Sequence, residues 1–295
     1  TLAAWWGPLL HWLADAPEQE PAKRAAPQGL RVLWITPLRA LAADSEQSLL
    51  APIRALGLPW TVERRTGDVS GYAKQRQLKR PPNALITTPE SLSLLLSQPN
   101  AQTYFANLQA VIVDEWHELL ASKRGVQTEL CLARLRGWQP QLRTWGLSAT
   151  LGNLPIAMAA LLGVDKASQA DAAGSVRSGR LIQGLLPKEI VIDSLIPQQV
   201  ERFPWAGHLG LKMLPQVLRA IEEGRTALVF TNTRSQTEIW FQAILAARPQ
   251  WAGELALHHG SLSAETRDFV ENGLRSGQLR CVVCTSSLDL GVDFS

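Results

Sequence analysis

The chain has 295 residues, of which 46% are hydrophobic and 19% are charged, and its formal net charge is +3 at pH 7. This balance is typical of a globular protein with about two domains, and it excludes an intrinsically disordered chain. A net charge this small gives only weak support for a polyanionic partner, so a nucleic-acid function has to be argued from motifs.

The first half of the sequence predicts a parallel sheet with helices on both faces. Apolar residues at helical spacing predict a helix over Leu2–Leu13 with Thr1 as its N-cap, and a surface loop follows over Ala14–Gly29. Nearly continuous apolar strands then alternate with helices, as in sheets that are buried on both faces. The predicted strands are Arg31–Thr36, Trp60–Thr66, Ala84–Thr87, Gln109–Val113 and Arg143–Leu147, and the predicted helices are Leu38–Leu56 and one that begins at Glu90.

A second set of strands and helices follows a linker. Residues 167–184 are small and polar, so we place a linker at 167–187 between a first domain, residues 1–166, and a second, residues 188–295. The predicted fold class is therefore α/β, with a parallel sheet in each domain. The predicted strands of the second domain are Lys188–Ser194, Thr226–Thr231, Glu254–His258 and Leu279–Thr285, and its predicted helices are Leu209–Glu223 and Ser235–Ala247.

The cysteines and the hydropathy favour a cytoplasmic protein. Three cysteines are too few for a disulfide framework and fit a reducing compartment. No stretch reaches the ~18 consecutive apolar residues that a transmembrane helix needs, and the apolar start lacks the basic residues of a signal peptide. Cys281 and Cys284 lie three apart in a predicted strand and so face opposite sides of the sheet. We expect two buried thiols there rather than a zinc site.

The strongest chemical signal is the run Asp114-Glu115-Trp116-His117, directly after a predicted strand. Two carboxylates at the carboxyl end of a buried strand lie where open α/β sheets bind ligands. In phosphoryl transfer the first acid can hold Mg²⁺ and the second can orient the attacking water. Taken alone, the motif is equally well explained as a solvated strand end. We expect Trp116 to be a core residue rather than a platform for stacking bases.

Hydroxyl side chains follow three other predicted strands. Ser148-Ala149-Thr150 comes after the fifth strand, and Thr36-Pro37 and Thr88-Pro89 each place a hydroxyl at a strand end with a proline opening a helix. The two Thr-Pro positions would point backbone amides at an anion, and Ser148-Ala149-Thr150 could bridge the acidic motif to a neighbouring surface. Taken alone, each is better explained as an ordinary cap. The basic cluster over 74–80 is expected to be a solvated face, with DNA contact as the second possibility. His258 and His259 lack metal-spaced partners, which favours a polar loop.

The order of these motifs resembles the two-lobed helicases of superfamily 2, which are built from paired RecA-like domains. The chain is most similar to the large helicase-related (Lhr) group and, within it, to the bacterial ligase-associated DEXH-box helicases, because of the run 114–119. The resemblance covers essentially the whole chain. The other segments that carry it are Arg202–Leu209, Leu228–Arg234, His258–Leu262 and Thr285–Asp293.

The resemblance implies an ATP site and a track for a nucleic-acid strand. Asp114 would bind Mg²⁺, Glu115 would activate water, and His117 would link the nucleotide site to the second domain. Ser148 and Thr150 would couple hydrolysis to strand movement. The other residues implied in nucleotide binding are Thr1, which would also contact Mg²⁺, Gly291 and Asp293. The residues implied in holding the strand backbone are Thr36, Arg39, Gly67, Thr88, Thr231, Arg234, Gly260, Ser261 and Thr285.

The sequence departs from the family pattern at both ends. It contains no phosphate loop of the form GxxxxGK[ST], and the family's motif with the arginine finger would follow Ser295. The resemblance therefore predicts a helicase fragment in which Thr1 is the last residue of a truncated phosphate loop; the alternative is a simple N-cap. Since an arginine finger contributes about 10³–10⁵ in rate in related NTPases, we expect negligible ATPase activity from this chain alone.

The expected function of the parent protein is ATP-dependent translocation along single-stranded DNA, with 3′-to-5′ movement, a role in DNA repair and a ligase or nuclease partner implied by the resemblance. An RNA helicase of the same superfamily is the first alternative, because backbone contacts carry no base information. A non-catalytic nucleic-acid-binding remnant is the second. An unrelated doubly wound enzyme is the third, and the ordered motifs argue against it.

Overall fold

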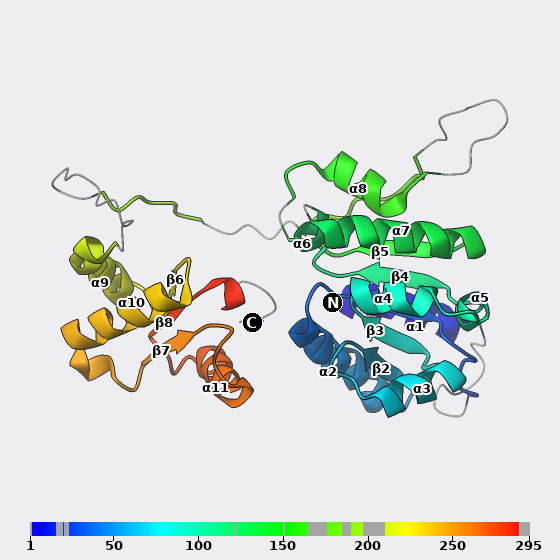
Figure 1. Cartoon of the computed structure of the whole chain (residues 1–295), viewed down its shortest axis with the longest axis horizontal. Coiled ribbons are helices and arrows are strands. Elements are labelled where there is room, and N and C mark those ends of the chain that lie inside the picture. The colour runs from blue at the N-terminus through cyan, green and yellow to red at the C-terminus, as the bar shows by residue number, and fades with distance from the viewer. Residues whose placement is uncertain are drawn as a thin grey trace. The chain divides into compact units, whose positions relative to one another are not determined.

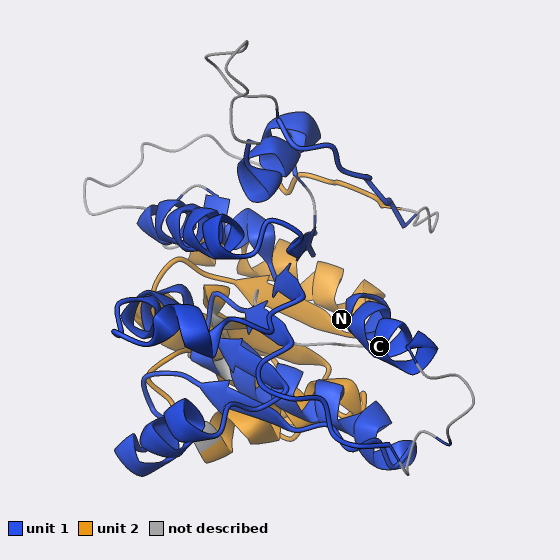
Figure 2. Ribbon diagram, turned by 90° about the vertical axis from the view of Figure 1, so that its right-hand side faces the viewer, with its two compact units in different colours: residues 1–184 blue, residues 185–295 orange. Residues whose placement is uncertain are grey.

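The computed structural model describes residues 2–15, 20, 24–120, 122–149, 151–164, 176–184, 190–196 and 210–288. The chain divides into two compact units, Thr1–Gly184 and Leu185–Ser295, which Figure 2 colours separately. The boundary falls within the segment that we expect to be the linker. Each unit is described below by itself.

Unit 1 contains a five-stranded parallel sheet in the order β2-β3-β1-β4-β5 (Figure 1). The predicted α/β class with a parallel sheet is confirmed, and each predicted strand overlaps an observed one. The strands are β1 Val32–Ile35, β2 Val62–Arg65, β3 Ala84–Thr87, β4 Ala110–Val113 and β5 Arg143–Gly146. The helices are α1 Leu2–Ala14, α2 Arg39–Ala55, α3 Gly71–Lys79, α4 Pro89–Leu96, α5 Ala101–Tyr104, α6 Trp116–Leu120, α7 Lys123–Trp138 and α8 Leu154–Leu162.

Alternation along the central strands divides the core of unit 1 into two layers. Val32 and Trp34 of β1 pack with residues of α1 and α2 on one face. Leu33 and Ile35 pack with residues of α4 and α7 on the other. A strand whose two faces are both buried reads as a continuous apolar run, which is why the sequence pattern was sufficient to predict these strands.

Unit 2 contains a three-stranded parallel sheet in the order β6-β8-β7. Cys281 packs on one face with residues of α9 and α10, and Cys284 packs on the other with residues of α11. Both cysteines are buried and neither forms a disulfide, so the expectation of two buried thiols is confirmed. The strands are β6 Ala227–Phe230, β7 Leu255–His258 and β8 Cys281–Cys284. The helices are η2 Leu211–Met213, α9 Leu214–Glu223, α10 Arg234–Ala247, η3 Pro249–Trp251, α11 Ala264–Arg275 and η4 Ser286–Leu288.

Two expectations about the second unit need correction. The predicted strand Lys188–Ser194 is wrong for the part that the structure describes, because residues 190–196 have no regular secondary structure. Ile192 is 91% exposed there, since an apolar run forms a strand only where a neighbouring strand pairs with it. The predicted helix Leu209–Glu223 begins as a 3₁₀ turn at Leu211, where Gly210 has a left-handed φ of 69°.

The loop before β1 is also less exposed than its composition predicts. Arg24 is buried, its guanidinium lies 5.2 Å from the ring centre of Trp12, and it donates a hydrogen bond to the Trp12 carbonyl at 3.0 Å. Among the described helices, none is both long and apolar enough to cross a membrane.

Candidate functional site

The carboxyl ends of the unit 1 strands bring the predicted site residues to one edge of the sheet. The amide of Thr36, after β1, donates to the Thr87 carbonyl at 2.9 Å, and the amide of Asp114, after β4, donates to the Ile35 carbonyl at 2.8 Å. These bonds extend the strand pairing by one residue and fix the backbone from which the polar side chains project. Open parallel sheets bind ligands at this edge.

Asp114 is a buried carboxylate with a donor on each oxygen. The indole Nε1 of Trp34 donates to Oδ2 at 3.1 Å, and the amide of Glu115 donates to Oδ1 at 3.1 Å. Burial raises the pKa of Asp114, while these two hydrogen bonds favour the ionised form. Mg²⁺ prefers carboxylate oxygens and is usually held by one or two of them together with phosphates and water. The donor set of Asp114 fits that role.

Glu115 has a strained backbone. Its φ of 47° is the one positive value among the described residues other than glycine. Its side chain is 31% exposed, and burial first and Asp114 second raise the pKa of its carboxyl. A carboxylate with a raised pKa at a ligand-binding edge is suited to accept a proton from water or to orient it. Strain of this kind, about 1–3 kcal/mol, is commonly found at functional sites.

His117 connects the acidic motif to the hydroxyl motif after β5. The Ser148 hydroxyl lies 3.2 Å from Nδ1, and the Ala149 amide donates to Nδ1 at 3.4 Å. Nε2 lies 3.6 Å from Glu118 Oε1, and Nδ1 also lies 3.5 Å from Glu115 Oε2. The structure therefore places His117 between both motifs.

Trp116 is a core residue, as expected. It is 2% exposed, and its indole N–H donates to the Ala157 carbonyl at 3.1 Å. It thus anchors the start of α6 beneath the acidic motif. Four of the expected site residues, Thr1, Thr150, Gly291 and Asp293, lie outside the described residues.

One of the two Thr-Pro motifs opens a helix as expected. Thr88 occupies the N-cap position of α4 with Pro89 first in the helix, although its hydroxyl makes no capping bond. Helix α2 begins at Arg39, so Pro37 does not open it, and the Thr36 hydroxyl donates instead to the Leu38 carbonyl at 2.9 Å. The expected helix start is therefore confirmed at Thr88 and wrong at Thr36.

Arg39 and Gly67 are brought together. A Cβ atom on Gly67 would lie 2.7 Å from an Arg39 guanidinium nitrogen, so the two residues are in close contact. In the same turn the Thr66 hydroxyl donates to Asp68 at 2.5 Å and lowers the pKa of that carboxyl. Two residues expected to hold a nucleic-acid backbone, Arg39 and Gly67, are thus neighbours.

Unit 2 has a corresponding edge of its own. The Thr231 amide, after β6, donates to the Cys284 carbonyl at 2.8 Å, and the Thr285 amide, after β8, donates to the His258 carbonyl at 3.1 Å. Among the expected strand-binding residues, Arg234 opens α10, Gly260 is exposed, and the Ser261 amide donates to His259 Nδ1 at 3.3 Å. Thr231, Gly260, Ser261 and Thr285 therefore all follow the carboxyl ends of parallel strands.

His258 and His259, expected to have a polar role in a loop, are 1% and 4% exposed. His259 Nδ1 accepts the hydrogen bond from the Ser261 amide in the loop after β7. The described residues contain no cluster of histidine, cysteine and acidic side chains that could hold a metal ion. His258 Nε2 lies 3.4 Å from Glu271 Oε1. Burial, followed by the charges of Arg267 and His259, lowers the pKa of His258 to about 4.

Acidification is therefore expected to destabilise unit 2. His258 takes up a proton near pH 6.5 in the unfolded state and near pH 4 in the folded state. The contribution of neutral His258 to the free energy of unfolding is therefore fully present above pH 6.5 and is lost as the pH falls towards 4. The raised pKa of Glu271 acts in the opposite sense. We expect the free energy of unfolding to fall by about 2 kcal/mol between pH 7 and 4.5. Denaturant titrations at both pH values check this, and His258→Asn should flatten the dependence while His11→Asn, at an exposed site, should not.

Comparisons with known protein families match both units of the chain. Residues 3–157 match the DEAD/DEAH box helicase family, and residues 210–295 match the helicase conserved C-terminal domain.

Relatives that carry both regions are longer than this chain. ATP-dependent helicase Lhr-Core protein 2 of Thermococcus barophilus is 36% identical over 274 residues, which cover 89% of this chain and 31% of that protein. Lhr helicase/uracil glycosylase of Escherichia coli is 31% identical over 311 residues, covering 89% of this chain and 20% of that protein. The chain thus spans less than a third of the length of these curated relatives.

Solved structures share the fold. The helicase Lhr of Mycobacterium smegmatis, bound to ssDNA and AMP-PNP, is 32% identical with a TM-score of 0.61, over 91% of this chain and 35% of that one. The DUF1998 helicase MrfA, bound to DNA and AMPPNP, has a TM-score of 0.68 at 20% identity, over 98% of this chain and 38% of that one.

Proposed function

Because the chain belongs to the DEAD/DEAH box helicase family of superfamily 2, and its relatives are of the Lhr group, we propose that it is the motor core of an ATP-dependent DNA helicase or translocase. Residues 1–166 would form the first RecA-like domain and residues 188–295 the second. The Lhr helicase of similar sequence was solved with ssDNA and AMP-PNP, which supports single-stranded DNA as the substrate.

One observation carries the proposal: the acid pair and the Ser148 motif meet at His117 on the carboxyl edge of the sheet. Ser148 lies 3.2 Å and Glu115 3.5 Å from the same ring nitrogen. A change in the position of the acid pair would therefore be transmitted to the hydroxyl motif through the His117 side chain alone. This is the arrangement that a motor needs if a reaction is to alter its contacts with a strand.

Each residue can then be given a step. Bound Mg·ATP supplies the phosphoanhydride bond that is cleaved, and Asp114 would hold the metal ion. Glu115 would orient the attacking water and accept its proton, a role for which its raised pKa suits it. His117 would link the two motifs, because its Nδ1 lies 3.5 Å from Glu115 Oε2 and 3.4 Å from the Ala149 amide nitrogen.

The strand-binding edge suits a motor that ignores sequence. Hydroxyls, backbone amides and arginine bind phosphates and carry no base information. In unit 1 these groups come from Thr36, Arg39, Gly67 and Thr88, and in unit 2 from Thr231, Arg234, Gly260, Ser261 and Thr285. The same chemistry would serve RNA, which makes an RNA helicase the second candidate; competition between DNA and RNA of one sequence separates the two.

The proposal is tested with the full-length protein. We expect ATP hydrolysis that is stimulated by single-stranded DNA, and tighter binding of the strand with AMP-PNP than with ADP, because both domains have to grip one strand together. Equal affinity in the two nucleotide states, with no ATP hydrolysis, would contradict the motor and leave a non-catalytic binding protein. The 3′-to-5′ direction, the repair role and the ligase or nuclease partner stay predictions, and unwinding of tailed duplexes tests the first.

A further inference from the structure

Helix α3 packs against the outer strand β2 through a polar face. Its one buried residue is Gln77, which is 2% exposed, while Tyr72 is 82% exposed and Leu78 adds a partly buried apolar contact. A buried polar group without a partner costs about 1–3 kcal/mol, so a helix docked in this way depends on the pairing of its polar side chains. The position of α3 is therefore set by specific hydrogen bonds more than by apolar area.

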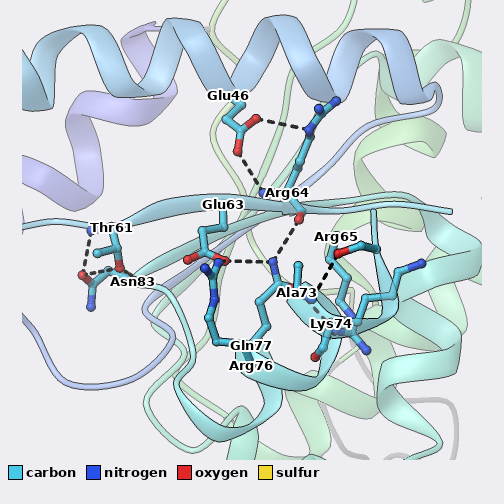
Figure 3. Close-up of polar contacts among 11 residues, drawn as sticks. Glu46, Thr61, Glu63, Arg64, Arg65, Ala73, Lys74, Arg76, Gln77 and Asn83 are labelled. Carbon is cyan, nitrogen blue, oxygen red and sulfur yellow. Dashed lines mark hydrogen bonds and ion pairs between the residues drawn. The ribbon is translucent and has the colours of Figure 1, made fainter. Parts of the chain in front are cut away.

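The Gln77 side-chain amide joins the helix to two neighbouring side chains and the backbone of β2 (Figure 3). Its Nε2 donates to Glu63 Oε2 at 2.9 Å and to the Arg64 carbonyl at 3.0 Å, and its Oε1 accepts from Arg65 Nη1 at 3.2 Å. Glu63 Oε2 also pairs with Arg76 Nη2 at 2.7 Å. Because residues two apart on a strand share a face, one amide can contact both the acid and the base.

The same contacts continue from α3 to the turn that follows β2. Arg65 Nη1 donates to the Lys74 carbonyl at 2.8 Å, and Lys74 Nζ donates to the Gly67 carbonyl at 3.2 Å. The helix is fixed at its start by Ser70, whose hydroxyl accepts from the Ala73 amide at 3.2 Å. A shift of α3 away from β2 would therefore move the backbone of Gly67.

The turn at Gly67 lies directly beside the guanidinium of Arg39. The guanidinium of Arg39 lies against the Cα of Gly67 so closely that a Cβ there would be 2.7 Å from it. Arg64 Nη1 lies 3.8 Å from Asp68, the next residue of the turn. The turn thus has three cations around it. Lys74 belongs to α3 and contacts the Gly67 carbonyl, Arg39 belongs to α2, and Arg64 also pairs with Glu46 of α2 at 3.2 Å.

We propose that Gln77 is a positioning residue for nucleic-acid binding, because it holds α3 and, through Lys74, the turn at Gly67 beside Arg39. This inference rests on the proposed function. It adds a residue that does not itself contact the nucleic-acid strand and that lies outside the predicted strand-binding motifs. The position needs a side chain that both donates and accepts, since Gln77 donates to Glu63 and accepts from Arg65 at the same time.

The test compares Gln77→Leu with Gln75→Leu in the full-length polypeptide. Gln75 lies on the same helix but is exposed. Both variants replace a glutamine by leucine, and they differ in whether that glutamine packs against β2. We expect Gln77→Leu to raise the Kd for an oligothymidylate strand about tenfold, which corresponds to ~1.4 kcal/mol. The slope of log Kd against log salt should fall by about one, as when one phosphate contact is lost. The Kd for AMP-PNP should stay unchanged, and Gln75→Leu should match the wild type.

A charge exchange keeps the test informative if Gln77→Leu fails to fold. Gln77→Glu retains the acceptor for Arg65 but faces Glu63, so we expect it to weaken strand binding, and Glu63→Gln in the same molecule should restore it. Strand binding that is equal in Gln77→Leu and Gln75→Leu, or a Gln77→Glu variant that Glu63→Gln does not rescue, would overturn the inference. If the wild type itself shows no nucleotide-dependent strand binding, the proposed function fails instead.

Discussion

Glu115→Gln in the full-length polypeptide is expected to lower kcat for ATP hydrolysis by about 10²–10⁴-fold, the usual contribution of a positioned general base. The amide keeps the size of the side chain but cannot accept a proton from water. Its neutral charge also removes the repulsion from Asp114 that contributes to the raised pKa of Glu115. Binding of ATP and of single-stranded DNA should therefore be retained, so that kcat falls while the strand affinity in AMP-PNP stays at the wild-type value.

Glu118→Gln is the matched control for this prediction. Glu118 is 3.6 Å from His117 Nε2 and its side chain is 37% exposed, so it faces the same ring without belonging to the acid pair. We expect the control to retain hydrolysis, with thermal unfolding of both variants as in the wild type. Similar losses of kcat in the two variants would show that general disturbance of His117, rather than proton transfer at Glu115, explains the effect.

The sequence predicted best those parts of the fold in which neighbours in the chain determine the structure. Strand β3 was predicted with its observed bounds, and Asp114 with Glu115 was placed at the carboxyl end of a strand, because a continuous apolar run is a local signal. The Trp34 indole that donates to Asp114 was not predicted. It comes from a strand 80 residues earlier, and only the pairing of β1 with β4 brings the two together.

Polar packing was the other source of missed features. Helix α3 was interpreted as a basic cluster because its face towards the sheet carries Gln77 in place of apolar residues at helical spacing. Helix α2 begins at Arg39, within one residue of the predicted start at Leu38, but Pro37 does not open it because Leu38 takes the N-cap position. The residues 190–194 were predicted as a strand from their β-branched side chains alone, which specify a strand only with a partner.

Gly125→Ala is expected to be the most destabilising single-methyl change in unit 1. A Cβ on Gly125 would lie 2.1 Å from the carbonyl oxygen and 2.7 Å from the carbonyl carbon of Leu119. Among the described glycines, no other Cβ position lies as close to a neighbouring atom. Both atoms belong to the backbone of α6, so no side-chain rotation can relieve the clash. Leu119 is itself fully buried in the core. We expect a loss of about 3 kcal/mol, at the upper end of the range for overpacking.

Gly137→Ala, in the same helix α7, provides the opposite expectation. No atom lies within 4 Å of the Cβ position at Gly137, so the methyl group fits and the gain in helix propensity remains. We expect this control to stabilise unit 1 by about 0.5–1 kcal/mol, measured by denaturant unfolding alongside Gly125→Ala. Equal stabilities of the two variants would contradict the close approach of α6 to α7.

The Gly125 prediction also extends to the site, because the helix that would have to move is the one that carries His117. A displaced α6 would separate His117 from Ser148, which lies 3.2 Å away on the segment after β5. Folded Gly125→Ala should therefore hydrolyse ATP more slowly than its folded fraction predicts, even at temperatures where unfolding is slight. A rate that simply follows the folded fraction would mean that α6 keeps its place and that the strain is absorbed by the start of α7.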